Sequence, residues 1–205
     1  PLLILSAGKS SRMGTPKGLV LYKSKPLLLY QLLMFKRAGG KRVIIVLGYQ
    51  LAKYTCTFPF LKKALYKWIT YNGLKIRVVR NWHPSRGQFS SLQCGFNKIK
   101  HSPFFFMTPI DVPSPKKEVF IQLIKNISTK FVCIPFYKKI GGHPILIRSS
   151  WMKHVFKKNL KSFEARLDYQ IRILQKETLS RITVNDKTIT FNLNAPADLI
   201  RQTLT

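Results

Sequence analysis

Acidic side chains are scarce in this sequence. Its 7 Asp and Glu residues stand against 36 Lys and Arg residues, which gives a formal net charge of +29. This imbalance favours an acidic partner, namely nucleic acid, an acidic protein or a phosphorylated small molecule, and the sign of the charge does not choose among them. The basic residues never stand more than two in a row, so the chain lacks the basic arm typical of many nucleic-acid-binding proteins. A solvated basic surface without a partner explains the same composition, and nucleic acid is not favoured.

Cysteine and long apolar runs are scarce as well. Three cysteines, Cys56, Cys94 and Cys133, are widely separated and form no CxxC pair. That pattern excludes a disulfide framework and a zinc site, so we expect a reducing cytoplasm. No apolar run approaches the roughly 20 residues needed to cross a bilayer. The chain opens on an apolar stretch without a basic leader, so we expect a cytoplasmic protein without membrane association.

What the sequence does contain is an alternation of strand-like and helix-like patterns, within the length of a single domain covering residues 1–205. We expect strands at 2–5, 42–48, 75–81, 104–110, 181–184 and 188–193, and two more within 131–147 around a turn at Gly141–Gly142. We expect helices at 26–40, 61–71, 91–99, 117–127, 149–160 and 163–175, with a short one from Pro196. Trp68, Trp151 and residues 104–106 are expected in the core.

This alternation predicts an α/β fold with three layers, in which helices cover both faces of an open, mostly parallel sheet of the Rossmann-like kind. Ligands of such sheets bind outside the carboxyl ends of the strands. The loops that follow residues 2–5, 75–81 and 104–110 are therefore the places to look for a site.

The first of these loops has the composition of a phosphate cradle. Small residues at 6–8 would let backbone amides approach a phosphate closely, and three cations, Lys9, Arg12 and Lys17, follow. The spacing is not that of a P-loop, and Ser10 stands where the dinucleotide fingerprint needs a second glycine. A solvated strand-to-helix turn that happens to be basic remains the alternative.

Five stretches of the chain together resemble one family. LSAGKSSRMGTPKG (5–18), NWHPSRGQFSSLQCGF (81–96), IDVP (110–113), GGHPILI (141–147) and FNLNAPADL (191–199) are similar, in order, to motifs of the molybdenum cofactor cytidylyltransferase-like (MobA-like) NTP transferases. They span nearly the whole chain. The pair Ala7-Gly8 is closer to the cytidylyltransferase branch than to the guanylyltransferase branch.

The resemblance implies a nucleotidyltransferase with a nucleotidyltransferase fold and a Mg²⁺ cofactor. It would move a nucleoside monophosphate from an NTP, with CTP favoured, to a phosphorylated acceptor, molybdopterin cofactor in the first instance, and release pyrophosphate. The implied catalytic residues are Arg12, Lys17 and Asp111, the implied metal ligands are Asp111 and Asn194, and His143 would lie on the acceptor side. The implied nucleotide-binding residues are Ser6, Ala7, Gly8, Lys9, Ser10, Arg12, Lys17, Asn81, Ser91 and Gly95.

Several of these residues also fit a structural role. Asp111 could cap a turn, Ser91 could be the N-cap of the helix that follows it, and His143 could be a satisfied turn histidine. Asn194 stands where many relatives have Asp, and it would serve equally well as a helix N-cap or as a neutral oxygen ligand. Asp198 is expected to be structural, as an acid in a first helical turn.

Two other functions stay open. The acceptor could be a sugar or alcohol phosphate, or the chain could be a non-catalytic, basic nucleic-acid-binding domain of the same fold. The intact first loop and Asp111 count against the second of these.

Overall fold

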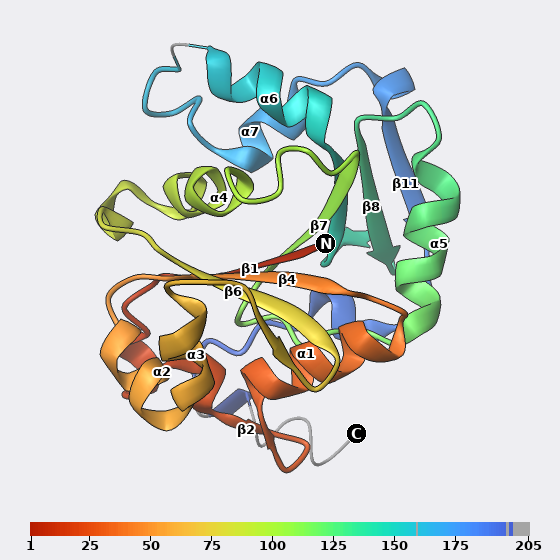
Figure 1. The fold of residues 1–205 in the computed structure, drawn as a ribbon. Coiled ribbons are helices and arrows are strands. Elements are labelled where there is room, and N and C mark those ends of the chain that lie inside the picture. Colours follow the sequence, from red (N-terminus) through yellow and green to blue (C-terminus); the bar gives the residue numbers. More distant parts are fainter. Residues whose placement is uncertain (159, 196, 199–205) are drawn as a thin grey trace.

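A single large sheet organises the fold of the computed structural model, which describes residues 1–158, 160–195 and 197–198 (Figure 1). Its strand order is β11-β8-β10-β7-β1-β4-β6-β5, with β9 paired to β8. The central pairs β1–β4, β1–β7 and β4–β6 are parallel, whereas β10 runs antiparallel to both β7 and β8. The strands are β1 (Leu2–Ser6), β4 (Arg42–Leu47), β5 (Ile69–Tyr71), β6 (Leu74–Arg80), β7 (Phe104–Pro109), β8 (Val132–Tyr137), β9 (Ile140–Gly141), β10 (Ile145–Arg148) and β11 (Leu179–Thr183).

Helices cover both faces of this sheet, as predicted, because its central strands are apolar on both sides. Leu2 and Ile4 of β1 pack in one cluster with α1 (Leu27–Arg37), α2 (Leu51–Thr57), α3 (Pro59–Ala64) and α5 (Lys117–Ile127). Leu3 and Leu5 pack in the other cluster with α4 (Gln88–Phe96) and α6 (Ser149–Lys157), next to which lies α7 (Leu167–Arg172) (Figure 1). The three-layer α/β architecture expected from the sequence is confirmed.

The helix predicted at 61–71 is wrong in its second half. It ends at Ala64, and residues 69–71 form β5, which pairs antiparallel with β6. Trp68 therefore lies between a helix and an edge strand and is 39% exposed, which corrects its assignment to the core, whereas Trp151 is buried as expected. The sequence also gave no sign of α2, a helix of two turns between β4 and α3.

The chain between β8 and β10 turns at Lys138–Lys139 rather than at the predicted glycine pair. Both lysines have positive φ and close the hairpin of β8 with β9. Gly142 serves packing instead, because a Cβ there would lie 2.4 Å from the carbonyl oxygen of Ile189.

Other boundaries differ by smaller amounts. The expected strand at 188–193 is instead a 3-10 helix, η5 (Lys187–Thr190), followed by an extended segment, and the helix expected at 163–175 is limited to α7. Of the short helix expected from Pro196, the structure describes Ala197 and Asp198, which are helical, and the rest lies outside the described residues.

The parallel strands β1, β4, β6 and β7 all end at the same edge of the sheet (Figure 1). The loops that follow them therefore meet at this edge, as expected for an open α/β sheet. Within the described residues, no helix combines the length and the apolar character needed to cross a membrane.

Candidate active site

A cleft of about 340 Å³ opens at this edge of the sheet. Its walls come from the ends of β1 and β7, the loop after β1, the start of α4, and Asn194 near the end of the described chain. The lining residues are Leu5, Ser6, Ala7, Gly8, Lys9, Ser10, Ser11, Arg12, Lys17, Pro84, Gly87, Gln88, Ser91, Pro109, Ile110, Asp111 and Asn194. Three cations face one carboxylate here, so the cleft favours an anionic ligand.

The loop after β1 folds as two short 3-10 helices, η1 (Ser11–Met13) and η2 (Lys17–Leu19). Two residues with positive φ, Ser10 and Gly14, flank η1 and reverse the chain around it. A Cβ on Gly8 would meet no atom within 4 Å, so the backbone there faces open space. The Lys17 backbone N–H donates to Ser10 Oγ over 3.3 Å, which joins the two ends of the loop.

Tyr54 of α2 connects the two ends of this loop by hydrogen bonds. Its hydroxyl lies 2.7 Å from Ser6 Oγ and accepts a hydrogen bond of 2.8 Å from the backbone N–H of Gly18. Burial raises the pKa of the Tyr54 phenol, so it stays neutral and can donate as well as accept. A Cβ at position 18 would lie 2.5 Å from the Tyr54 hydroxyl oxygen, so a glycine is needed there. The sequence did not single out Tyr54, because the helix that carries it was not foreseen.

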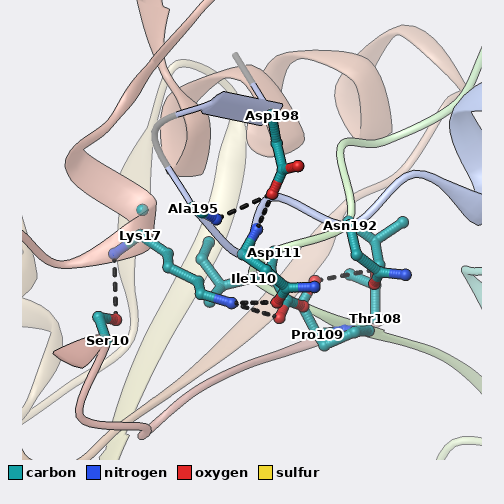
Figure 2. A network of polar contacts seen from close by, with 12 residues as sticks. Ser10, Lys17, Thr108, Pro109, Ile110, Asp111, Asn192, Ala195 and Asp198 are labelled. Atoms are coloured by element: carbon teal, nitrogen blue, oxygen red, sulfur yellow. Dashed lines mark hydrogen bonds and ion pairs between the residues drawn. The ribbon is translucent and has the colours of Figure 1, made fainter. Parts of the chain in front are cut away.

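Lys17 joins the two predicted metal ligands, Asp111 and Asn194. Figure 2 shows its side chain reaching Asp111. Its Nζ donates to Asp111 Oδ2 over 2.8 Å and to Asn194 Oδ1 over 2.9 Å. The Lys17 and Asp111 side chains are only 14% and 25% exposed, so water screens this ion pair weakly. Asp111 also accepts a hydrogen bond from the backbone N–H of Leu193 at its carbonyl oxygen, over 2.8 Å. Asp111 and Asn194 thus meet at one ammonium group, although they lie 94 and 177 positions from Lys17 in the sequence.

Asp198, rather than Asn194, provides the side chain that accepts backbone N–H groups at the end of the described chain. One oxygen of that carboxylate, Oδ2, accepts hydrogen bonds from the backbone N–H groups of Asn194 and Ala195, each over 2.8 Å (Figure 2). This is a structural role, as the sequence predicted for Asp198. Among the contacts of the described chain, Asn194 Oδ1 accepts from Lys17 and not from a helix N–H, so its oxygen faces the cleft.

The opposite wall is built by the start of α4, which Asn81 holds from behind. Asn81 Nδ2 donates to Ser90 Oγ and to Ser91 Oγ over 2.9 and 3.0 Å, and its Oδ1 accepts from the His83 N–H over 2.9 Å. Ser91 lines the cleft. The alternative that Ser91 is an N-cap is wrong, since α4 begins at Gln88, with Gly87 as its N-cap residue.

Asn81 and Gly95 stand behind the cleft rather than on its lining. Asn81 is buried and orients the serines of α4. A Cβ on Gly95 would lie 2.3 Å from Leu3 Cδ1 and 2.8 Å from Val46 Cγ2, so this glycine brings α4 close to the sheet. The contacts found for both residues therefore support the wall instead of reaching into the cleft.

His143 lies on the segment that joins β9 to β10 and is half-buried. Its backbone N–H donates to the carbonyl oxygen of Ile189 over 2.8 Å. Burial lowers the pKa of His143 to about 4, although the nearby charge of Asp111 acts in the opposite direction. The imidazole is therefore neutral at pH 7, and His143 is not among the residues that line the cleft.

The donor set of the cleft fits a hard divalent cation. Asp111 Oδ2 and Asn194 Oδ1 converge on a single ammonium group, which shows that both oxygens already serve one positive charge. Among the described residues, no cluster of three or more His, Cys, Asp or Glu side chains could hold a metal. Mg²⁺ is commonly bound through one or two protein ligands plus waters and substrate phosphates, so two oxygens suffice.

Comparisons with known proteins give one family match and several structural matches. Residues 2–179 match the family model of the MobA-like NTP transferase domain. Curated protein sequences give no significant match. Solved structures with a similar fold include Rv0371c from Mycobacterium tuberculosis H37Rv (TM-score 0.72, 17% identity, covering 99% of this chain and 97% of that one).

Two further solved structures are similar. One is a nucleotidyl transferase from Methanothermobacter, Mth528 (TM-score 0.75, 15% identity, 98% and 94% coverage). The other is 4-diphosphocytidyl-2C-methyl-D-erythritol synthase from Anaerococcus prevotii (TM-score 0.70, 13% identity, 99% and 93% coverage). At these identities the structures show the shared fold.

Proposed function

The chain belongs to the MobA-like NTP transferase family and is a nucleotidyltransferase, and from this premise we propose that it moves a nucleoside monophosphate from CTP to a phosphorylated acceptor, with molybdopterin cofactor as the first candidate. The observation that carries the proposal is the position of Lys17. Its ammonium lies between Asp111 and Asn194, beside a loop with open backbone and two further cations, Lys9 and Arg12. This arrangement suits a triphosphate with its counter-ion.

Each residue then has a role that follows from its position. The loop at Ser6, Ala7, Gly8, Lys9 and Ser10 would receive the triphosphate, because small residues and basic side chains line the cleft there. Asp111 and Asn194 would hold Mg²⁺, which when bound offsets the negative charge of the triphosphate. Arg12 and Lys17 would neutralise the leaving pyrophosphate.

The transfer itself needs no covalent intermediate with the protein. A phosphate oxygen of the acceptor would attack the α-phosphorus, a new phosphorus–oxygen bond would form, and the bond to the β-phosphate oxygen would break as pyrophosphate leaves. The chain's contribution is positioning and electrostatics. His143, neutral at pH 7, would donate a hydrogen bond to the acceptor side, while Ser91 would face the nucleotide base, supported by Asn81 and Gly95.

Two observations bear on the substrates. The Ala7-Gly8 form of the loop resembles the cytidylyltransferase branch and favours CTP. The structural neighbour from Anaerococcus prevotii is named for a cytidylyl product of a methylerythritol, which favours an alcohol phosphate as the alternative acceptor. Mg²⁺ is the proposed metal, and a neighbouring structure, Rv0371c, was solved in complex with manganese.

Titration calorimetry of CTP, GTP, ATP and UTP with Mg²⁺ tests the site directly. We expect CTP to bind most tightly in a metal-dependent manner, and Asp111→Asn to lose that dependence. Asp168→Asn is the matched control, because Asp168 forms an exposed ion pair on α7 away from the cleft. An absence of nucleotide binding at any Mg²⁺ concentration would contradict the proposal.

Turnover provides the second measurement. Lys17→Met should lower kcat by about 100-fold or more, since it removes a charge aimed at the leaving group in a weakly screened site. Lys125→Met, on the exposed side of α5, should leave turnover unchanged. Pyrophosphate release measured with molybdopterin cofactor and with alcohol phosphates identifies the acceptor, and a near-normal rate in Lys17→Met would contradict the role of the lysine.

A further inference from the structure

Gln31 is a polar residue in the middle of the apolar helix α1. Its sequence context is LLLYQLLMF, and its side chain is completely buried, on the face that α1 presents to the sheet. A buried amide in such a place calls for an explanation, because burying polar atoms without full hydrogen bonding is unfavourable.

The Gln31 amide points at the turn that carries Asp111. Nε2 donates to the carbonyl oxygen of Val112 over 2.6 Å, and it lies 3.2 Å from the carbonyl oxygen of Pro109 and 3.4 Å from that of Ile110. These carbonyls flank Asp111 on both sides. The fourth carbonyl of this run, that of Asp111 itself, accepts from the backbone N–H of Leu193. The two N–H groups of the Gln31 amide are therefore shared among the carbonyl oxygens of Pro109, Ile110 and Val112, with the shortest contact to Val112.

The other end of the amide shows what this arrangement costs. Gln31 Oε1 is buried and has no hydrogen-bond partner among the residues that the structure describes. Turning the amide over would set Oε1 against three carbonyl oxygens, so the observed orientation is the favourable one. An apolar residue would remove the unpaired oxygen, but it would leave the carbonyls of the turn without this donor. The residue thus serves the turn at the expense of its own oxygen.

We propose that Gln31 is the positioning residue of Asp111. With the peptide groups before and after Asp111 held by α1, the carboxylate is directed to the place where Oδ2 meets Lys17 Nζ. The Leu193 N–H bond fixes the same turn to the segment that ends in Asn194. Gln31 thereby sets the spacing of the two oxygens that are proposed to hold the metal. This inference rests on the proposed function for the role of Asp111.

A residue that only stabilises the fold would affect all properties of the protein alike, whereas a positioning residue would affect metal use in particular. Gln31→Met keeps the length of the side chain and removes the donor. Leu32→Ala is the matched control, because Leu32 is the next residue of α1, equally buried, and lines a different hollow beside Tyr71 and Leu74. Gln31→Asn keeps an amide with a shorter reach and is the second variant.

The first measurement is amide hydrogen exchange in the full chain. In Gln31→Met we expect faster exchange for residues 110–114 than in the wild type, with Gln31→Asn between the two. Leu32→Ala should not single out this segment. Unchanged exchange at 110–114 in Gln31→Met, or the same local increase in Leu32→Ala, would overturn the inference. Where Gln31→Met does not fold, unchanged exchange at 110–114 in Gln31→Asn would overturn it instead.

The second measurement is CTP turnover as a function of Mn²⁺ concentration. Gln31→Met should raise the Mn²⁺ concentration for half-maximal rate by about 10–100-fold, because replacing a residue that orients a metal ligand commonly weakens metal binding by that factor. The KM for CTP at saturating Mn²⁺ should stay close to that of the wild type. An unchanged Mn²⁺ requirement would overturn the inference. A wild type without metal-dependent turnover would overturn the proposed function instead, and hydrogen exchange would still decide whether Gln31 holds the turn.

Discussion

Lys17 and His143 are both candidate contacts for phosphate groups, but they differ in charge at neutral pH. Lys17 is held by a carboxylate and a carbonyl oxygen, whereas burial lowers the pKa of His143 to about 4. Burial removes water from the imidazole and so disfavours its protonated form. The basic residues that line the cleft are Lys9, Arg12 and Lys17.

This pKa predicts a specific dependence of stability on pH. His143 takes up a proton near pH 6.5 in the unfolded chain but only near pH 4 in the folded one. The unfolded state thus binds more protons between these values, and the free energy of unfolding falls as the pH is lowered from 6.5 to 4. Replacing His143 by Gln should remove a part of that fall on the order of 2–3 kcal/mol. Urea unfolding of the wild type and of His143→Gln at pH 7 and pH 4.5 measures this difference. The same fall in unfolding free energy in both proteins would contradict the lowered pKa of His143.

At the scale of single residues, the sequence was most informative where chemistry is unusual. Asp111 could be found because a carboxylate at the end of an apolar strand is rare in so basic a chain. Asn194 was left between two roles, since an asparagine before a short helix fits a cap as well as a ligand. Only the three-dimensional contact with Lys17, 177 positions away, shows where its oxygen points. Gln31 carried a weak signal, a lone amide on an apolar helix face, whose meaning depends on the turn it faces.

Among the elements, α2 has the clearest connection to the site. Tyr54 ties the end of β1 to η2 and so closes the base of the loop at residues 6–18. Tyr54→Phe would leave the buried N–H of Gly18 without an acceptor, which should lower the free energy of unfolding by about 1–3 kcal/mol. A looser loop should also raise the KM for the nucleotide more than it lowers kcat.

Urea unfolding and steady-state kinetics check this prediction. Tyr66→Phe is the control, because Tyr66 is 78% exposed and lies after α3, away from the loop. A loss of stability in Tyr54→Phe with an unchanged KM would mean that the tyrosine supports the fold but not the loop.

Elements were predictable where hydrophobic periodicity is strong and poorly predictable at sheet edges. The helix at 117–127 has the expected bounds, because its apolar residues recur at helical spacing between polar ones. Residues 61–71 read as one helix because Leu61, Ala64 and Trp68 share that spacing. Pairing with β6 instead draws 69–71 into the sheet. Asn72 and Gly73 both have positive φ and form the two-residue turn between β5 and β6. An Asn-Gly pair at such a place is a hairpin signal, which the helical interpretation overlooked. Likewise, two lysines with positive φ form a turn that glycine was expected to make.

At the scale of the whole molecule, the net charge of +29 is the dominant feature. The ion pairs found between described residues use only two carboxylates, Asp111 and Asp168, so attraction between surface charges offsets little of the repulsion. Salt shortens the Debye length from about 30 Å at 0.01 M to about 8 Å at 0.15 M. We therefore expect added NaCl to stabilise the fold, with roughly 2–4 °C in Tm for each kcal/mol gained.

Thermal unfolding at a series of NaCl concentrations measures this effect, and KCl should give the same curve because the screening anion is unchanged. A Tm that stays constant or falls with salt would show that the positive charges do not oppose folding. The alternative of a nucleic-acid-binding domain predicts a different result. Nucleic-acid affinity would then fall steeply with added salt, and the protein would show no nucleotide turnover.

The distance along the chain between Lys17 and Asn194 has a consequence for the order of events during synthesis. The ribosome makes the chain from its N-terminus, and a domain generally folds as a unit. The strands β1, β4, β6 and β7 and the loop after β1 belong to the first 109 residues and are made first. The oxygen of Asn194 joins Lys17 only after nearly all of the described chain has been made. A nascent chain that already contains the loop after β1 and the end of β7 therefore still lacks one of the oxygens that face Lys17, and the cleft is completed only with the last part of the domain to be made.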